Sequence, residues 1–304
     1  MSKIYDLIIL GAGPAGITAA VYAARKKLDF IVLTVNVGGQ AAASWDIENY
    51  TGYQFITGPE LVSRFQEHLD SFGIQLNKDE QVSRILKEGS LVKTVTSKGE
   101  YLSKSVIVAT GKRSRQLNAQ GEEKFRNKGV TYCATCDGPL FKGKDVAIIG
   151  GGNSAFDAAL QLIKIAPKVH IVDIADHLAG DPVMIEKVEA APNLEIHSSS
   201  QVKKIYGNAL VEGIEIEKNS KLINLAVKGV FIEIGLIPNS EFAGILTRNE
   251  QGEVKVDSHN RTSIDGIFAA GDVTDVPEKQ IIIACGEGSK ACLSAFNYLS
   301  THKF

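Results

Sequence analysis

Cys133 and Cys136 lie in the segment CATCDGPLF and are separated by only two residues. This spacing lets two thiols close a small, easily reduced disulfide, and it often lowers a thiol pKa toward neutrality. Both properties suit thiol–disulfide exchange better than stabilisation of a fold. A zinc site would also need Cys285 and Cys292, which are separated by six residues in an apparent helix, and no histidine is well placed. We therefore predict no metal site, and we interpret these last two cysteines as small core residues.

Two glycine-rich turns could bind dinucleotides. GAGPAG begins at Gly11 and GGGNSA begins at Gly150, and each follows an apolar strand-like run and precedes an alanine-rich helical stretch. In the first motif Gly11 permits the tight turn, Gly13 lets the backbone approach a pyrophosphate, and Gly16 allows close packing of helix on strand. The pyrophosphate would then lie at the positive end of a helix that begins near Pro14.

The two turns differ in the strand that follows. After the second turn, the strand-like run KVHIVDIAD places Asp173 about 20 residues past the glycines, where a carboxylate can accept both ribose hydroxyls. After the first turn, the corresponding run FIVLTVN offers only Thr34 or Asn36. The second turn therefore predicts a nicotinamide dinucleotide site, whereas the ligand of the first turn needs further support.

The elements that position these motifs repeat along the chain. Each half contains a strand, a glycine turn and a helix, and each closes with a continuous apolar run, SVIVATG or GVFIEIG, as buried parallel strands do. After Pro238 a new series begins, with EVKVD, GIFAAGD and a helix from about Gln280 to Leu299, and we place it on the first unit. We predict an α/β protein with two Rossmann-like nucleotide-binding domains of the three-layer ββα type. The first comprises residues 1–114 and 243–304, and the second, residues 115–242, is inserted into it.

Composition agrees with a two-domain globular enzyme. The 304 residues are 44% apolar and 22% charged, with a formal net charge of -2. Lysines and arginines are spread along the chain, which argues against nucleic-acid and anionic-membrane partners. The longest apolar stretches are far short of the roughly 20 residues needed to span a bilayer. No secretory signal is apparent at the amino terminus, so we expect a cytoplasmic protein.

Four further segments accompany these motifs: GGQ at 38–40, DIENYTG at 46–52, ATG at 109–111 and AAGDVTD at 269–275. With them the chain resembles the low-molecular-weight thioredoxin reductases over nearly its whole length. The resemblance implies that these segments bind FAD, with Asp272 near the ribityl and phosphate oxygens. It assigns to FAD the residues Gly11, Gly13, Pro14, Ala15, Gly16, Gly39, Gln40, Asn49, Thr110, Gly111, Gly271, Asp272, Lys279, Gln280 and Ile281, the last two at the isoalloxazine.

By the same resemblance the second domain binds a nicotinamide dinucleotide through Gly150, Gly152, Asn153, Ser154, Ala155, Asp173 and Gly235. Relatives that use NADPH carry a His-Arg-Arg cluster where this chain has Asp173, Ile174 and Ala175. Losing each charged contact to the 2′-phosphate costs roughly 1.5–3 kcal/mol, and a carboxylate adds repulsion. We therefore predict NADH rather than NADPH. The alternative left open is that Asp173 is a solvated strand end and that the pocket binds neither dinucleotide well.

The resemblance also divides the roles around the thiols. Cys136 should lie against the flavin, Cys133 should attack the disulfide of a thioredoxin- or glutaredoxin-like protein, and Asp137 should manage the proton of the departing thiol. Otherwise Asp137 is a turn residue. Hydride would pass from NADH to FAD, and electrons from FAD to the thiol pair. Because that pair and the nicotinamide site share one domain, the domains should rotate about short connections near Lys112 and Phe242.

Within this family, GVTYCATCDGPLFKGK, IIGGGNS and KQIIIACGEGSKA look most like the reductase module of the flavoprotein component of alkyl hydroperoxide reductase. That component carries an extra amino-terminal thioredoxin-fold segment, whereas here the first glycine turn begins within eleven residues of Met1, so we expect a separate acceptor protein. The family also implies a homodimer. Three other functions stay open: a flavin reductase or peroxide-forming NADH oxidase, an oxidase of small-molecule dithiols, and a nucleotide-binding redox sensor without turnover.

Overall fold

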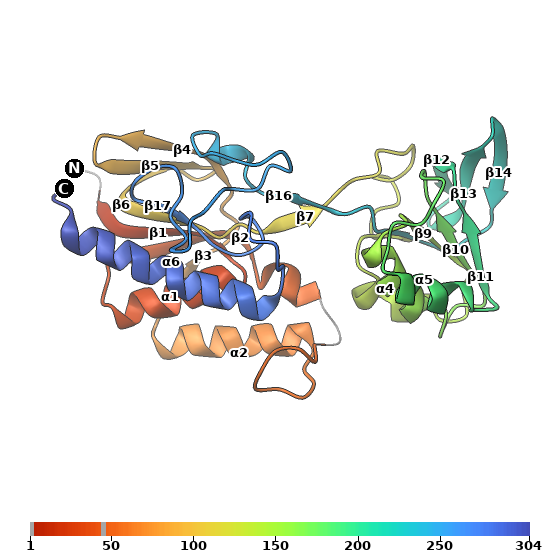
Figure 1. Ribbon diagram of the computed structural model, residues 1–304, viewed down its shortest axis with the longest axis horizontal. Helices are drawn as coiled ribbons and strands as arrows, with labels where there is room; N and C mark the ends of the chain where they lie inside the picture. Colours follow the sequence, from red (N-terminus) through yellow and green to blue (C-terminus); the bar gives the residue numbers. More distant parts are fainter. Residues whose placement is uncertain (1–2, 44–46) are drawn as a thin grey trace. The chain divides into compact units, whose positions relative to one another are not determined.

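The computed structural model describes residues 3–43 and 47–304, except for the side chains of Ala43 and Cys136. The chain divides into two compact units: unit 1 comprises Met1–Arg113 and Ile237–Phe304, and unit 2 comprises Ser114–Leu236. Strands β7 (Lys112–Ser114) and β16 (Leu236–Pro238) carry the chain between them and pair with each other (Figure 1). The predicted insertion ended at residue 242, whereas unit 2 ends at Leu236, because the return to unit 1 begins in β16.

Unit 1 is built on a seven-stranded sheet with the order β3-β2-β1-β6-β5-β4; β5 pairs with the first residues of β6, and β17 pairs with its last residues, Val106–Val108. The parallel strands are β1 (Ile4–Ala12), β2 (Phe30–Val37), β3 (Leu76–Asn77), β6 (Glu100–Val108) and β17 (Ile267–Ala269). Strands β4 (Val82–Glu88) and β5 (Leu91–Thr96) form an antiparallel hairpin. The GIFAAGD segment thus supplies β17, while the EVKVD segment forms only isolated bridges at Val254.

The two faces of β1 bury different layers, as the alternation of side chains along a strand requires. Leu7 and Ile9 pack against helices, whereas Ile8 and Leu10 pack on the side of the β4–β5 hairpin, and all four are fully buried. Helices α1, α2 and α6 lie on one face of this sheet (Figure 1). Their bounds are Pro14–Arg25, Gly58–Ser71 and Ile281–Thr301, and the short helices η1 and η3 span Gly39–Ala43 and Glu241–Ala243.

Small residues let α1 and α6 approach closely. A Cβ atom on Gly288 of α6 would collide with the carbonyl oxygen of Ala15 in α1, so this contact requires glycine. The contact explains why the tail of the chain belongs to unit 1: α6 completes the helical layer beside the first glycine turn. The predicted helix from about Gln280 to Leu299 is thereby confirmed, with its end two residues later.

Unit 2 contains a five-stranded parallel sheet with the order β11-β10-β9-β15-β8. Its strands are β8 (Val130–Thr131), β9 (Val146–Ile149), β10 (Val169–Val172), β11 (Leu194–His197) and β15 (Gly229–Ile232). Helices α4 (Asn153–Leu162) and α5 (Pro182–Glu189) share one core cluster with this sheet. The meander β12 (Ser200–Gly207), β13 (Val211–Lys218) and β14 (Lys221–Leu225) shares the other. The thiol segment, residues 133–141, forms α3 (Ala134–Asp137) and η2 (Gly138–Phe141).

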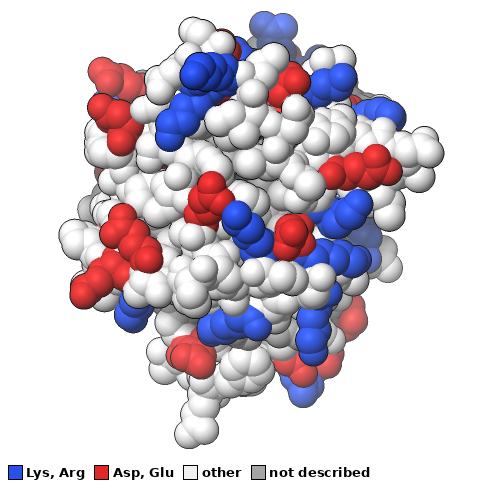
Figure 2. Space-filling model, turned by 90° about the vertical axis from the view of Figure 1, so that its right-hand side faces the viewer, with Lys and Arg blue, Asp and Glu red and all other residues white. Residues whose placement is uncertain are grey.

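The predicted fold class is confirmed, since each unit contains a sheet whose central strands are parallel, with a strand, a glycine turn and a helix at its centre. Figure 2 shows one face of the molecule, where acidic and basic side chains are interspersed. Among the residues described, no helix is long and apolar enough to cross a membrane.

Candidate functional site

The first glycine turn connects β1 to α1. Gly11 has a positive φ of 106°, and a Cβ atom there would collide with the carbonyl of Ala109; a Cβ atom on Gly16 would collide with the carbonyl of Gly11. Both obstacles are backbone atoms, so these positions need glycine for the fold itself. Gly13, in contrast, faces open space, because the nearest atom to a Cβ atom there would be Cα of Gly39 at 4.0 Å.

The helix that leaves this turn presents its positive end without a side-chain cap. Gly13 is the N-cap residue of α1, it makes no side-chain cap hydrogen bond, and Pro14 occupies the first turn. The N–H groups at such a helix start need an outside acceptor. An anion, such as a pyrophosphate, meets that need and also interacts favourably with the helix dipole.

Two loops close around the turn from distant parts of the sequence. Gly39, with φ of 53°, would place a Cβ atom 3.4 Å from Cα of Gly13, so η1 lies against the turn. Gly271 would place a Cβ atom 3.0 Å from Cβ of Ala15, and its N–H donates to Glu287 Oε2 at 2.7 Å. The structure thus gathers these predicted FAD residues in one place.

Asp272 and Gln40 join these loops directly, since Gln40 Nε2 donates to Asp272 Oδ2 at 3.2 Å. Asp272 is half-buried, and burial raises the pKa of its carboxyl, while the ammonium groups of Lys279 and Lys112 oppose that rise. Lys279 is held by the carbonyl of Thr274 at 2.5 Å and by Glu253 at 3.2 Å. The carboxylate of Asp272, bonded to Gln40 and lying near these ammonium groups, can accept hydrogen bonds from the hydroxyls of a polyol.

The remaining residues of the predicted FAD set divide into two groups. Asn49 Nδ2 donates to Gln280 Oε1 at 3.0 Å, just before α6 begins at Ile281. Thr110 and Gly111 are bonded to the returning chain instead: the Thr110 hydroxyl donates to the carbonyl of Asn239 at 2.6 Å, and the Asn239 N–H donates to the carbonyl of Gly111 at 2.9 Å. Asp46, at the start of the DIENYTG segment, lies outside the described residues.

The second turn repeats the backbone of the first. Gly150 has φ of 127°, and a Cβ atom there would collide with the carbonyl of Glu233. Gly152 is the N-cap residue of α4 without a side-chain cap, and nothing lies within 4 Å of the position its Cβ atom would take. Ala155, fully buried, stands where the first turn has its third glycine. This turn therefore also offers an open helix start to an anion.

The carboxylate of Asp173 lies against this turn, since a Cβ atom on Gly151 would collide with it. One of its oxygens, Oδ1, accepts a hydrogen bond from the N–H of Ala175 at 3.2 Å. The backbone of Asp173 is fixed as well: its N–H donates to the carbonyl of His197 at 3.1 Å, and its carbonyl accepts from Ser200 at 2.8 Å. Asp173 is thus a positioned residue beside the glycines.

The other residues predicted to bind the nicotinamide dinucleotide lie at the ends of neighbouring elements. Asn153 begins α4 and accepts a hydrogen bond on Oδ1 from the N–H of Asp181 at 2.7 Å, which ties it to the start of α5; Ser154 follows it in α4. Gly235, with φ of 93°, has open space where a Cβ atom would lie, and its carbonyl accepts from the N–H of Arg115 at 2.9 Å.

The thiol segment lies just before β9. Cys133 is half-buried and disulfide-bonded, whereas the side chain of Cys136 lies outside the described part. The N–H of Cys133 donates to the hydroxyl of Thr131 at 3.2 Å, and that hydroxyl donates to Oδ2 of Asp137. Asp137 is therefore connected to the backbone of Cys133 through one hydroxyl group. Cys285 and Cys292 are free and buried, which confirms them as core residues.

Glu233 is a candidate that the sequence analysis missed. It follows β15, and burial raises the pKa of its carboxyl to about 7, although a hydrogen bond from the backbone of Ala134 opposes the rise; Asp157 adds to it. Ala134 is the residue after Cys133, and the Glu233 carbonyl faces Gly150, so this carboxyl lies between the thiol segment and the second turn. The signal in the sequence was a single acid within the apolar run GVFIEIG.

Comparison with known proteins gives the family. The profile of the pyridine nucleotide-disulphide oxidoreductases matches residues 5–288. The chain belongs to this family. Its relatives include an NADH dehydrogenase of Ferdinandcohnia aciditolerans, 41% identical over 299 residues, and a component of the alkyl hydroperoxide reductase of Escherichia coli, 41% identical over 303 residues. Both alignments cover 97% of this chain, but only 57% and 58% of those relatives.

Solved structures of the same family share the fold. Thioredoxin reductase from Lactococcus lactis superposes with a TM-score of 0.86 at 35% identity, covering 98% of this chain and all of that one. The thioredoxin reductase of T. acidophilum gives a TM-score of 0.83 at 35% identity, covering 97% of this chain and 99% of that one. The predicted resemblance to thioredoxin reductases is therefore confirmed.

Membership in this family implies FAD and a pyridine nucleotide as cofactors. The residues present fit both groups. Each glycine turn leads into a helix start without a side-chain cap, and each leaves open the position of its second glycine, Gly13 or Gly152, where a pyrophosphate would approach. Beside the first turn lies Asp272, suited to a polyol, and beside the second lies Asp173, suited to a ribose.

Proposed function

We propose that this protein is an FAD-dependent disulfide reductase, which uses NADH to reduce Cys133 and Cys136 and passes the electrons to a thioredoxin- or glutaredoxin-like protein. The observation that carries the proposal is the disulfide at Cys133, in the same unit as a dinucleotide-type turn and connected through Thr131 to the carboxyl of Asp137. Bound FAD would supply the conversion of a hydride from the nicotinamide into the two electrons that a disulfide takes up.

The residues around Cys133 can manage the protons of this reaction. Opening a disulfide to two thiols consumes two electrons and two protons. In the exchange step, the Cys133 thiolate attacks a sulfur of the partner and breaks the partner's disulfide; attack by Cys136 on the mixed disulfide then releases the partner as a dithiol. Asp137, held by the hydroxyl of Thr131, can protonate the departing thiolate. We therefore propose that Asp137 is a catalytic carboxyl rather than a turn residue.

The proposed preference for NADH rests on the surroundings of Asp173. Its carboxylate is positioned against the second turn, and the two following residues, Ile174 and Ala175, carry no positive charge. A ribose with free hydroxyls can donate to such a carboxylate, whereas a 2′-phosphate would meet repulsion and find no cationic partner on this strand end.

Each unit contributes one part of the proposed pathway. The turn assigned to FAD lies in unit 1, whereas both the thiols and the turn assigned to NADH lie in unit 2. Nicotinamide and disulfide must therefore reach a single flavin in succession. We propose that the paired strands β7 and β16 serve as the hinge for this exchange, since they alone carry the chain between the units.

The decisive experiment replaces Cys133 with serine. We expect NADH to bleach the flavin of Cys133→Ser anaerobically at the parental rate, while reduction of a thioredoxin disulfide falls by at least about 1000-fold, because the attacking thiolate is gone. Cys285→Ala, which removes a buried free thiol, is the matched control and should retain both activities. Undiminished thioredoxin reduction by Cys133→Ser would disprove the disulfide pathway.

The second candidate is an NADH oxidoreductase that does not use the thiols, as the naming of an NADH dehydrogenase among the relatives suggests. In that case a Cys133→Ser/Cys136→Ser double variant would oxidise NADH as fast as the parent in every assay.

The partner can be identified by trapping. Cys136→Ser should leave Cys133 in a mixed disulfide with its acceptor, and we expect a thioredoxin-fold protein in that adduct. We further propose a homodimer, as in the resembled family, which light scattering of the purified protein would test.

A further inference from the structure

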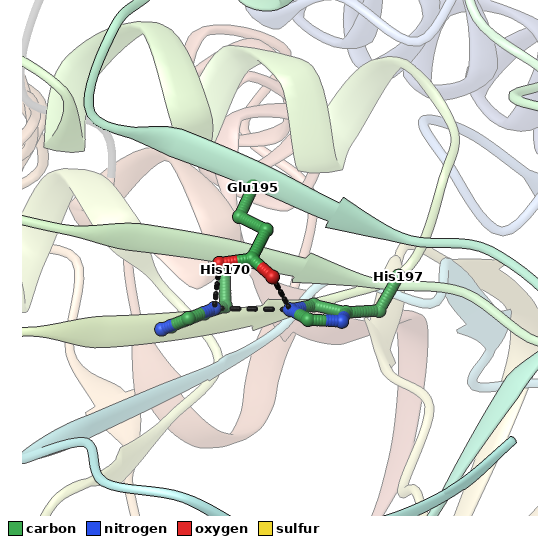
Figure 3. Close-up of side chains that lie close together, drawn as sticks. All are labelled: His170, Glu195 and His197. Atoms are coloured by element: carbon green, nitrogen blue, oxygen red, sulfur yellow. Dashed lines mark hydrogen bonds and ion pairs between the residues drawn. The ribbon is translucent and has the colours of Figure 1, made fainter. Parts of the chain in front are cut away.

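Three side chains of unit 2 converge outside the nucleotide and thiol sites: His170, Glu195 and His197 (Figure 3). Strands β10 and β11 run parallel, with His170 opposite Glu195, and His197 two residues further along shares the face of Glu195. Nδ1 of His170 lies 3.0 Å from Nε2 of His197. Oε2 of Glu195 lies 3.9 Å from Nδ1 of His170, and Oε1 of Glu195 lies 3.6 Å from Nε2 of His197.

The two imidazoles are buried, whereas the carboxylate reaches solvent. His170 and His197 are 6% and 7% exposed, and the side chain of Glu195 is 48% exposed. Burial lowers the pKa of both histidines, Lys168 lowers it further in each, and Glu195 opposes the change in both; His197 also lowers the pKa of His170. Neutral imidazoles each carry a nitrogen lone pair, which is the form that binds metals.

We propose that His170, Glu195 and His197 form a binding site for one divalent transition-metal ion, and that zinc is the ion that fits it best. Two imidazole nitrogens and one carboxylate oxygen are zinc ligands, and with bonds of roughly 2.0–2.1 Å the corners of a zinc tetrahedron lie about 3.3 Å apart. The two nitrogens lie 3.0 Å apart and Oε1 of Glu195 lies 3.6 Å from Nε2 of His197, two separations that bracket this value, and one ligand atom from each of the three residues lies within 4.8 Å of the others. Glu195 lies at the solvent side, so a water molecule can fill the fourth position.

One neighbour competes with the ion. Lys168 Nζ lies 2.6 Å from Oε2 of Glu195, while the oxygen nearer to His197 is Oε1. Coordination through Oε1 can therefore begin with that ion pair in place, but the ammonium group opposes the positive ion electrostatically. Removing the charge of Lys168 should strengthen binding of the metal.

A metal here would act on the nucleotide-binding edge of unit 2. The carbonyl of His197 accepts the N–H of Asp173 at 3.1 Å, so the same residue that would hold the ion also fixes the strand end carrying the proposed ribose partner. An ion shared between β10 and β11 would link these strands through side chains in addition to their backbone hydrogen bonds. We therefore expect zinc to raise the unfolding temperature of the protein.

The test uses the FAD-loaded protein, stripped with a chelator and titrated with zinc chloride under air without reductant, so that Cys133 stays in its disulfide and does not compete. Calorimetry and elemental analysis should give one zinc per chain. Glu195→Gln, an exposed change that spares the fold, should weaken binding at least about 10-fold, and His197→Ala at least about 100-fold. Lys168→Met should bind zinc more tightly than the parent.

His177→Ala is the matched control, because His177 is exposed and lies 2.6 Å from the carboxylate of Asp176, which gives it a surface histidine–acid pair without burial. It should bind zinc like the parent. The proposal is overturned if the parent binds no stoichiometric zinc, or if Glu195→Gln binds it as tightly as the parent. Loss of the zinc in His177→Ala would likewise place the ion elsewhere. Under any of these three outcomes, His170 and His197 are only a hydrogen-bonded pair within the sheet.

Discussion

The two glycine turns have similar backbone conformations, but the side chains beside them differ. In both, the first glycine abuts a carbonyl oxygen at the end of a parallel strand, that of Ala109 in unit 1 and that of Glu233 in unit 2, and the second glycine is open to a ligand. The third position is glycine in one turn and alanine in the other, so the helix approaches more closely in unit 1. The turn by itself therefore suits a pyrophosphate, and the side chains beside it decide which nucleotide can bind.

The strand ends beside the turns show how these side chains differ. Thr34 in unit 1 is buried and satisfied within the loop: its hydroxyl accepts from the N–H of Ala12 at 3.2 Å and donates to the carbonyl of Asn36 at 2.5 Å. Asp173 in unit 2 instead brings a charged carboxylate against the glycines. One turn thus has a closed polar end and the other an acceptor for hydroxyl groups.

We expect the largest effect from exchanging the residues at the third position of the two turns, Gly16 and Ala155. Gly16→Ala places a methyl group against the carbonyl of Gly11, so we expect unit 1 to lose about 2–3 kcal/mol of stability and much of its FAD. The reciprocal change, Ala155→Gly, should cost less than about 1 kcal/mol. Thermal unfolding and flavin content measure both. A Gly16→Ala protein as stable and as yellow as the parent would mean that the two turns tolerate the same residues.

Asp173→Ala should make the strand end beside the second turn resemble that beside the first, because it removes the charged acceptor for ribose hydroxyls. Losing hydrogen bonds to a charged acceptor costs about 1.5–3 kcal/mol, so we expect the KM for NADH to rise roughly 10- to 100-fold, with kcat little changed and the discrimination against NADPH reduced. Steady-state kinetics with both nucleotides provide the measurement, with Asp176→Ala, an exposed neighbour, as control. An unchanged KM would reduce Asp173 to the structural role it has towards Ala175.

Glu233 distinguishes unit 2 from unit 1, where Ala109 takes the same place. Because burial raises the pKa of Glu233 to about 7 from 4.5, the folded protein binds this proton more tightly than the unfolded chain. The stabilisation is complete below about pH 4.5 and is lost as the pH rises through 7. We therefore expect the free energy of unfolding of Glu233→Gln, relative to that of the parent, to increase by about 1–2 kcal/mol when the pH is raised from 5 to 8. Urea unfolding of both proteins at pH 5 and at pH 8 measures this difference.

The control for that experiment is Glu212→Gln, which removes an exposed acid from β13 of the same unit. Parallel pH profiles for the parent and Glu233→Gln would show that the carboxyl of Glu233 ionises normally.

The smallest effect concerns the open second positions. Gly152→Ala meets no atom within 4 Å, so the protein should unfold at the parental temperature. Its methyl group would nevertheless stand where a pyrophosphate approaches, which we expect to raise the KM for NADH about 5- to 10-fold, or roughly 1 kcal/mol. Gly13→Ala should weaken FAD retention in the same way. Parental affinities in both variants would place the pyrophosphates away from these glycines.

Local patterns were sufficient for the central elements of both units. The runs DLIIL and DVAII are continuous and apolar because their strands are buried on both faces, so glycine spacing and hydropathy located both turns and α6. The resemblance also pointed correctly to proximity over long range: Gln40 bonds to Asp272, and Asn49 to Gln280, across more than 200 residues of sequence.

Properties that arise only from packing could not be predicted. The pKa of Glu233 depends on desolvation by surrounding side chains, and the approach of His170 to His197 depends on the register of β10 with β11. Neither leaves a local pattern. The return to unit 1 was placed six residues late because the short strand β16 follows Gly235 without a turn signal that distinguishes it from a loop.

The pairing of β7 with β16 has a consequence for how unit 2 could be handled. The N–H of Arg115 donates to the carbonyl of Gly235 at 2.9 Å, so the inserted segment starts and stops at neighbouring points. A module with adjoining ends adds little closure entropy to its host, and it can be removed from the gene and replaced by a tight hairpin without stretching the remaining polypeptide. The excised piece would keep its own termini side by side, ready for circularisation or for exchange between homologous hosts.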